Sequence, residues 1–155
     1  MGLDPGSRVT GWGVVERCGA RISRVASGCL RSPAGRERPI LLASLAAGLE
    51  TLLARWQPSV VAIETPYIGK FARAALGLAE ARGAMLAVLG RWGGEVVEYE
   101  PARVKGAIVG FGGADKRQVA YVIRHELELE EEPAHDVADA LAIALCHVRH
   151  SRLDV

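Results

Sequence analysis

Cysteines, aromatic residues and an excess of charge of either sign are all scarce in this sequence. The three cysteines, Cys18, Cys29 and Cys146, lie far apart without a CxxC pair, which argues against a disulfide framework or a zinc ribbon and favours a reducing compartment. Aromatic residues make up only 5% of the chain, and the formal net charge is +1. Binding to a polyanion would therefore need a basic patch on one face.

Long apolar runs and a leader-like start are also missing. Charges and glycines interrupt every apolar run before about 20 residues, and no cationic segment followed by an apolar one begins the chain. We therefore expect a cytoplasmic protein without membrane contact. With 155 residues, half of them apolar, residues 1–155 are expected to form one domain.

The apolar pattern predicts an α/β fold. Residues 60–63 form a β-branched run too short for a helix, which is typical of a strand buried on both faces. The other expected strands are 1–3, 10–15, 21–31 and 95–99, and the expected helices are 40–56, 70–92, 102–109, 116–129 and 134–150. This order predicts a five-stranded mixed sheet, three antiparallel strands and then parallel ones, flanked by helices.

Four carboxylates stand at the ends or turns of these expected elements. Asp4 and Glu64 each end a strand, at the edge where sites form in parallel sheets. Asp136 and Asp139 are three residues apart on a helix, so both can point at one spot. We expect the four side chains to converge.

Such a cluster predicts a cation site. Carboxylates held close together repel one another and take up protons unless a cation neutralises them. Oxygen-only ligands favour Mg²⁺ or Mn²⁺, and a pair of such ions supports phosphodiester hydrolysis. Singly, each residue also has a structural interpretation: Asp4 as a turn former before Pro5, Glu64 and Asp139 as solvated charges, and Asp136 as a first-turn residue stabilised by the helix dipole.

Segments spread along nearly the whole chain resemble the RuvC Holliday-junction resolvases of bacteria, whose core has the ribonuclease H-like fold. The matching segments are 2–13 (GLDPGSRVTGWG), 62–64 (AIE), 79–83 (AEARG), 104–110 (VKGAIVG) and 136–144 (DVADALAIA). The resemblance implies a homodimer that binds a four-way DNA junction and nicks two strands symmetrically in homologous recombination and repair. It also implies an acidic site with Mg²⁺ or Mn²⁺, and two ions per site are expected. The matching catalytic and metal-binding carboxylates are Asp4, Glu64, Asp136 and Asp139.

The resemblance assigns further residues to the DNA. Lys105 and Lys116 match family lysines near the scissile phosphate, and Tyr67 matches an aromatic residue that stacks on junction bases. A basic track of further residues is expected along the same face, although each of them is also compatible with a solvated helix surface. These residues are Arg8, Lys70, Arg73, Arg82 and Arg117.

Two partners follow in the same way. A stripe of small residues along 70–92, including Ala79 and Gly83, allows close helix approach at a two-fold interface, or equally packing on the chain's own sheet. The family resemblance also implies a branch-migration motor.

Other functions stay open. A sugar kinase or actin-like domain has a similar phosphate-binding hairpin but needs a second lobe. A junction-binding protein that does not cut would not need all four carboxylates. A ribonuclease H-type enzyme acting on RNA–DNA hybrids would use the same chemistry.

Overall fold

A five-stranded mixed sheet organises the chain in a computed structural model, which describes the backbone of residues 1–65 and 72–151 and the side chains of these residues except 72–74. The sheet order is β3-β2-β1-β4-β5. The strands are β1 (Gly2–Asp4), β2 (Val9–Cys18), β3 (Arg21–Arg31), β4 (Val60–Glu64) and β5 (Glu95–Tyr99). β1 to β3 are antiparallel, whereas β4 runs parallel to both β1 and β5. The predicted mixed sheet is confirmed.

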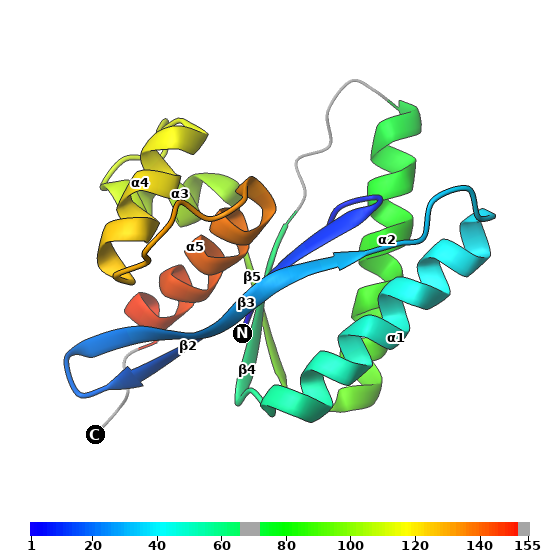
Figure 1. Cartoon of the computed structure of the whole chain (residues 1–155), viewed down its shortest axis with the longest axis horizontal. Helices are drawn as coiled ribbons and strands as arrows, with labels where there is room; N and C mark the ends of the chain where they lie inside the picture. The colour runs from blue at the N-terminus through cyan, green and yellow to red at the C-terminus, as the bar shows by residue number, and fades with distance from the viewer. Residues whose placement is uncertain (66–71, 152–155) are drawn as a thin grey trace.

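Helices cover both faces of this sheet (Figure 1). One face carries α1 (Arg38–Trp56) and α2 (Ala72–Trp92), and the other carries α3 (Pro101–Val109), α4 (Lys116–Glu126) and α5 (His135–His150). Several helix ends follow local chemistry. Pro39 and Pro101 stand in the first turns of α1 and α3, where a missing N–H is tolerated, and Asp115 and Gln118 form a capping box at α4.

Two apolar clusters, one on each face, form the core. Val61 and Ile63 of β4 point into the cluster with α1 and α2, while Ala62 between them belongs to the cluster with α3, α4 and α5. Alternate residues of a strand point to opposite faces, so β4 must be apolar throughout. The predicted two-sided burial of this strand is confirmed.

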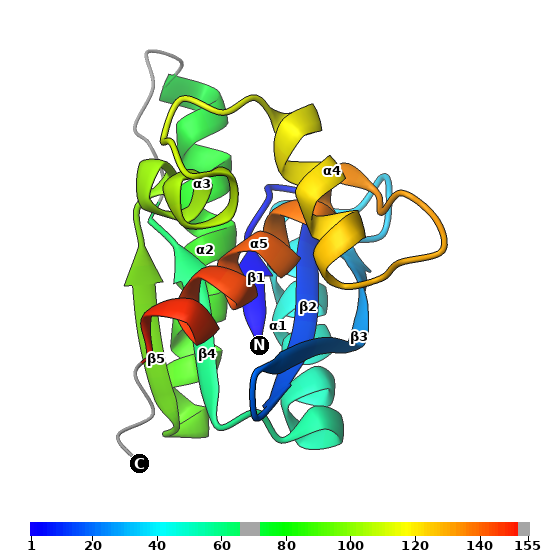
Figure 2. The same cartoon turned by 90° about the vertical axis from the view of Figure 1, so that its left-hand side faces the viewer.

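The most deeply inserted helix is α5, every residue of which from Val137 to Cys146 except Asp139 is buried. It crosses β1 and β2 closely enough that a Cβ on Gly2 would overlap the backbone of Ala140 and Ala144. Glycine in β1 therefore permits the close helix–sheet contact. Figure 2 shows α5 lying against the sheet beside β1 and β2.

Several predicted boundaries were wrong by a few residues. β2 continues to Cys18, three residues past the expected end, because its pairing with β3 extends as far as Arg21. α4 ends at Glu126 rather than 129, where Glu128 takes a positive φ of 50°. α1 begins at Arg38, and residues 70–71, expected to start the next helix, lie outside the described residues.

α1 also qualifies as a membrane span by length and composition alone, with a mean hydropathy of 1.2. The expectation from the sequence concerned an uninterrupted apolar run, which α1 is not, because Gly48, Glu50 and Arg55 interrupt it. A core helix of a globular domain passes the same test, and the apolar stripe of α1, including Leu45, Leu49 and Leu53, is buried in the core shared with α2.

Candidate active site

The four carboxylates meet at the carboxyl edge of the sheet. Asp4 ends β1 and Glu64 ends β4, and because these two strands are parallel neighbours, their ends lie side by side. Asp136 and Asp139 lie in the first two turns of α5, whose amino-terminal end approaches the same edge. The negative charges of Glu64, Asp136 and Asp139 all raise the pKa of Asp4. Asp4 therefore lies within electrostatic range of the other three carboxylates.

Gly11 explains how Asp136 reaches Asp4. Gly11 is the cross-strand partner of Asp4 in the β1–β2 pair. A Cβ on Gly11 would overlap the carbonyl of Asp136, so the start of α5 sits directly on this position of β2. A residue with a side chain at position 11 would push α5 away from the sheet.

Burial and mutual repulsion make the site electrostatically costly. Burial, then the charges of Asp139 and Glu64, raise the pKa of Asp4 from 3.8 to about 7, while Lys116 opposes the rise. Burial, then Asp139, also raises the pKa of Glu64, which Lys116 and Lys105 oppose. The site therefore holds more negative charge than the described lysines neutralise.

Lys116 and Lys105 stand among these carboxylates. Lys116 Nζ donates a hydrogen bond to Asp139 Oδ2 at 2.8 Å, and this bond raises the pKa of the lysine. Lys105 lines a small cavity of about 170 Å³ together with Glu64, Lys116 and Asp139. Both lysines that the family resemblance assigned to the reaction thus lie within the acidic site.

The side chains are not arranged as a closed coordination shell. Among the residues that the structure describes, no three His, Cys, Asp or Glu side chains are close enough together to hold an ion. Asp139 instead pairs with Lys116. The donor set still fits a hard divalent cation, because all four ligand candidates offer carboxylate oxygens and the half-buried Asp4 lacks full charge compensation.

The expected DNA-contacting residues have different surroundings. Arg8 and Arg117 are exposed. Arg82 is only 15% exposed, and its guanidinium pairs with Glu98 and donates to the backbone carbonyl of Glu64. Tyr67 and Lys70 lie outside the described residues, as does the side chain of Arg73.

A larger cavity, about 840 Å³, lies elsewhere. It separates the end of the β2–β3 hairpin from the segment that joins α4 to α5, and none of the four carboxylates lines it. Its walls include Glu126, Glu128 and Glu130–Glu132. An acidic lining repels phosphate, so the smaller cavity beside Glu64 is the better candidate for a phosphodiester.

Two residues at the site, Cys29 and Arg38, were missed by sequence reasoning. Cys29 pairs across the sheet with Gly11, and Asp136 and Asp4 contribute to raising the pKa of its thiol, after burial. Arg38, like Arg82, bonds the backbone near a carboxylate-bearing strand end. Strand register can reveal the position of Cys29, but the arginine contacts depend on how the helices pack.

A mixed sheet in the order β3-β2-β1-β4-β5, with acidic residues gathered at its carboxyl edge, defines a nuclease of the ribonuclease H-like class. The family model described as crossover junction endodeoxyribonuclease RuvC matches residues 1–147. The chain belongs to this family.

Named relatives agree. The chain is 45% identical over 148 residues to the crossover junction endodeoxyribonuclease RuvC of Chloroflexus aggregans, covering 95% of this chain and 90% of that protein. It is 46% identical over 150 residues to the protein of the same name from Halorhodospira halophila, with 97% and 89% coverage. A solved structure of T. thermophilus RuvC in complex with a Holliday junction substrate superposes with a TM-score of 0.90 at 32% identity, covering 98% of this chain and 93% of that one.

Proposed function

We propose that this chain resolves four-way DNA junctions by metal-dependent hydrolysis of phosphodiesters at Asp4, Glu64, Asp136 and Asp139. The observation that carries the proposal is the electrostatic influence of Asp139, Glu64 and Asp136 on the half-buried Asp4, which together with its burial raises the pKa of Asp4 to about 7. A protein that only bound junctions would gain nothing from this cost. Membership of the RuvC family is the reason for proposing a four-way DNA junction as the substrate.

The four carboxylates would hold Mg²⁺ or Mn²⁺, with two ions per site. When bound, the metal supplies an activated water and stabilises the leaving oxygen. Asp4 and Glu64, on rigid strand ends, fix one side of the site, and Asp136 and Asp139 on α5 fix the other. Lys116, which pairs with Asp139, and Lys105 both line the cavity beside Glu64, where their positive charges would bind and orient a phosphate.

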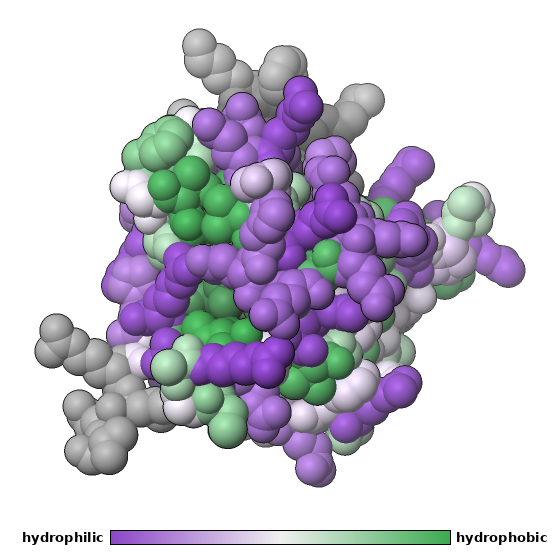
Figure 3. Space-filling model, turned by 60° about the vertical axis from the view of Figure 1, so that its left-hand side comes forward, coloured by the Kyte–Doolittle hydropathy of each residue, from purple (hydrophilic) through white to green (hydrophobic). Residues whose placement is uncertain are grey.

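The surface around the site suits the charged phosphate backbone of DNA. Figure 3 shows the face over α3, α4 and α5 to be largely hydrophilic, with hydrophobic patches between the polar groups. Arg117 follows Lys116 in the first turn of α4 and is exposed. With Arg8 on the loop after Asp4, it would extend phosphate contacts away from the cavity. The DNA contacts of Lys70 and Arg73 and the stacking of Tyr67 on junction bases remain predictions.

A homodimer would explain symmetric nicking. Leu76, Ala79 and Gly83 share a face of α2 on which all three are exposed, with Leu76 60% exposed. A Cβ on Gly83 would meet no described atom within 4 Å, so this face is open to a second helix. A two-fold partner there places two identical sites on one junction. The branch-migration motor and the cytoplasmic location remain predictions.

The test is a cleavage assay on a synthetic four-way junction, a linear duplex and an RNA–DNA hybrid, each with Mg²⁺ or Mn²⁺. We expect paired nicks in the junction alone, and a loss of at least about 100-fold in rate in Asp136→Asn, which removes one metal ligand. Junction binding without cutting in either metal would support a non-cleaving binding protein. Cutting of the hybrid instead would support a ribonuclease.

A further inference from the structure

Two arginines tie the end of β4 and the loop that follows β1 to the same helix, α2. Arg82 belongs to α2 itself, and its Nε donates to the backbone carbonyl of Glu64 at 3.4 Å. The same guanidinium pairs with Glu98 of β5, which also accepts a hydrogen bond from Thr65 Oγ1 at 3.4 Å. Arg82 therefore joins α2 to the end of β4 and to its neighbouring strand.

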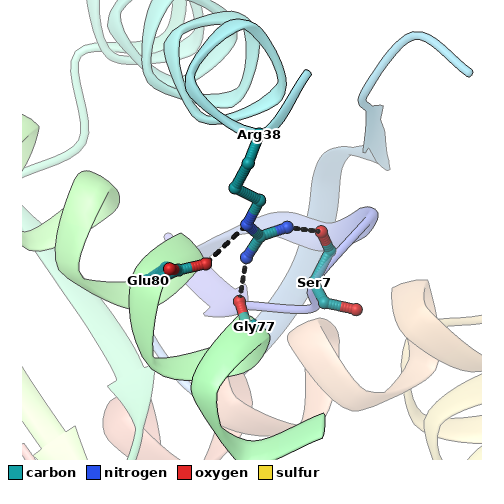
Figure 4. Close-up of polar contacts among 4 residues, drawn as sticks. All are labelled: Ser7, Arg38, Gly77 and Glu80. Carbon is teal, nitrogen blue, oxygen red and sulfur yellow. Dashed lines mark hydrogen bonds and ion pairs between the residues drawn. The ribbon is translucent and has the colours of Figure 1, made fainter. Parts of the chain in front are cut away.

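Arg38, the first residue of α1, makes the corresponding connection for β1 (Figure 4). Its Nη1 donates to the carbonyl of Ser7 at 3.1 Å, in the loop that follows Asp4. Its Nη2 donates to the carbonyl of Gly77, and its Nε donates to Glu80 Oε2 at 2.6 Å, both on α2. One guanidinium thus joins the loop after β1 to the start of α1 and the first half of α2.

These contacts are better shielded than the ion pair of Arg91 and Glu50, which also joins α1 and α2. The side chains of Arg38 and Arg82 are 31% and 15% exposed. Arg91 and Glu50, paired at 2.6 Å, are 63% and 53% exposed. Partly buried, charge-assisted bonds to backbone carbonyls restrain geometry, whereas exposed pairs contribute little.

The restrained groups are the ones that a metal site needs to hold still. Ligand geometry must be kept within about 0.5 Å, and this depends on the residues that support the ligands. We propose that Arg38 and Arg82 are positioning residues, which set the separation of Asp4 and Glu64 by fixing both strand ends to α2. The role rests on the proposed function, and it gives Arg82 a different task from the DNA contact expected from sequence.

The experiment compares Arg38→Gln and Arg82→Gln with Arg91→Gln as the matched control. Three quantities are measured: junction affinity in EDTA, the Mn²⁺ concentration that gives half-maximal cleavage, and direct Mn²⁺ binding by calorimetry. We expect junction affinity within about twofold of the unaltered chain, but about 10- to 100-fold weaker Mn²⁺ binding and a matching rise in the half-maximal concentration. Arg91→Gln should match the unaltered chain in all three.

Two more variants separate position from charge and from folding. Arg38→Lys keeps the charge but cannot reach three acceptors, so it should retain most of the defect. Glu80→Gln removes only the ionic partner of Arg38, so it should weaken Mn²⁺ binding, but less than Arg38→Gln does. This variant still tests the positioning role if Arg38→Gln fails to fold.

Unchanged Mn²⁺ binding in both glutamine variants, normal behaviour of Arg38→Lys, or weakened junction affinity in EDTA would overturn the positioning role. Absence of junction cleavage by the unaltered chain would instead count against the proposed function, and calorimetry would still test the positioning role.

Discussion

Asp4 is the residue whose charge state depends most on its surroundings. It is half-buried, and burial followed by the charges of Asp139 and Glu64 raises its pKa from 3.8 to about 7. Between these two pH values, folded Asp4 binds a proton that the unfolded chain releases. Stability of the metal-free protein therefore falls as the pH rises from about 4 to about 7, and the loss is complete above that window.

Asp4→Asn should remove the loss of stability that ionisation of Asp4 causes as the pH rises. Without divalent metal at pH 8, we expect a free energy of unfolding higher than that of the unaltered protein by a few kcal/mol, since one pKa unit corresponds to about 1.4 kcal/mol. At pH 4 the two proteins should be nearly equal. Urea unfolding at both pH values measures the difference, with Glu16→Gln, an exposed carboxylate change on β2, as the control. An equal gain at pH 4 and pH 8 would contradict the interpretation, and Mg²⁺ at pH 8 should narrow the gap.

At the level of elements, the contact between β2 and α5 decides where Asp136 lies. Gly11 is the cross-strand partner of Asp4 in the β1–β2 pair, and the carbonyl of Asp136 packs directly against Gly11. The sequence motif around Gly11 can therefore be understood as a packing requirement between a strand and a helix about 125 residues later in the chain. The position of Asp136 in the active site therefore depends on the close approach of α5 to β2 at Gly11.

Gly11→Ala should move the start of α5 away from β2. We expect a loss of about 1–3 kcal/mol in stability from overpacking, together with weaker Mn²⁺ binding, because Asp136 moves relative to Asp4. Gly106→Ala is the control, since a Cβ there lies 3.9 Å from Gly112 N and should stabilise α3 by up to about 1 kcal/mol. Thermal unfolding and calorimetry give both quantities. Normal Mn²⁺ binding by a folded Gly11→Ala protein would show that Asp136 does not depend on this contact.

At the scale of the whole molecule, packing within one copy does not explain why α2 exposes a face with Leu76 and small residues. Leu76, Ala79 and Gly83 are exposed on the helix that Arg38 and Arg82 connect to the active site. Contact between two copies through α2 would place the proposed interface next to the groups that position Asp4 and Glu64. Pairing of the two nicks would then follow from the geometry of the dimer.

Ala79→Arg should separate the copies. A guanidinium on this face blocks close helix approach, so we expect the sedimentation mass at micromolar concentration to fall from two chains to one. On a plasmid carrying a cruciform, products should change from linear DNA to nicked circles, because paired cuts become independent. Ala43→Arg, on an exposed position of α1, should leave both unchanged. A one-chain mass for the unaltered protein would refute the dimer directly.

Periodicity and turn chemistry in the sequence were enough to predict the five strands, their mixed order and the placement of Asp4 and Glu64 at strand ends. These features are local, because a β-branched run such as 60–63 specifies a buried strand wherever it is. The i, i+3 spacing of Asp136 and Asp139 likewise predicted that both face one site.

Tertiary structure alone decided how these parts are held. The bond of Lys116 to Asp139, the contact of Gly11 with Asp136, and the arginine bonds to Ser7 and Glu64 join residues far apart in the chain. No local pattern encodes such contacts, because they exist only once α2 and α5 have packed on opposite faces of the sheet. For the same reason Arg82, which in sequence resembles one more basic surface residue, becomes a largely buried support for the strand that carries Glu64.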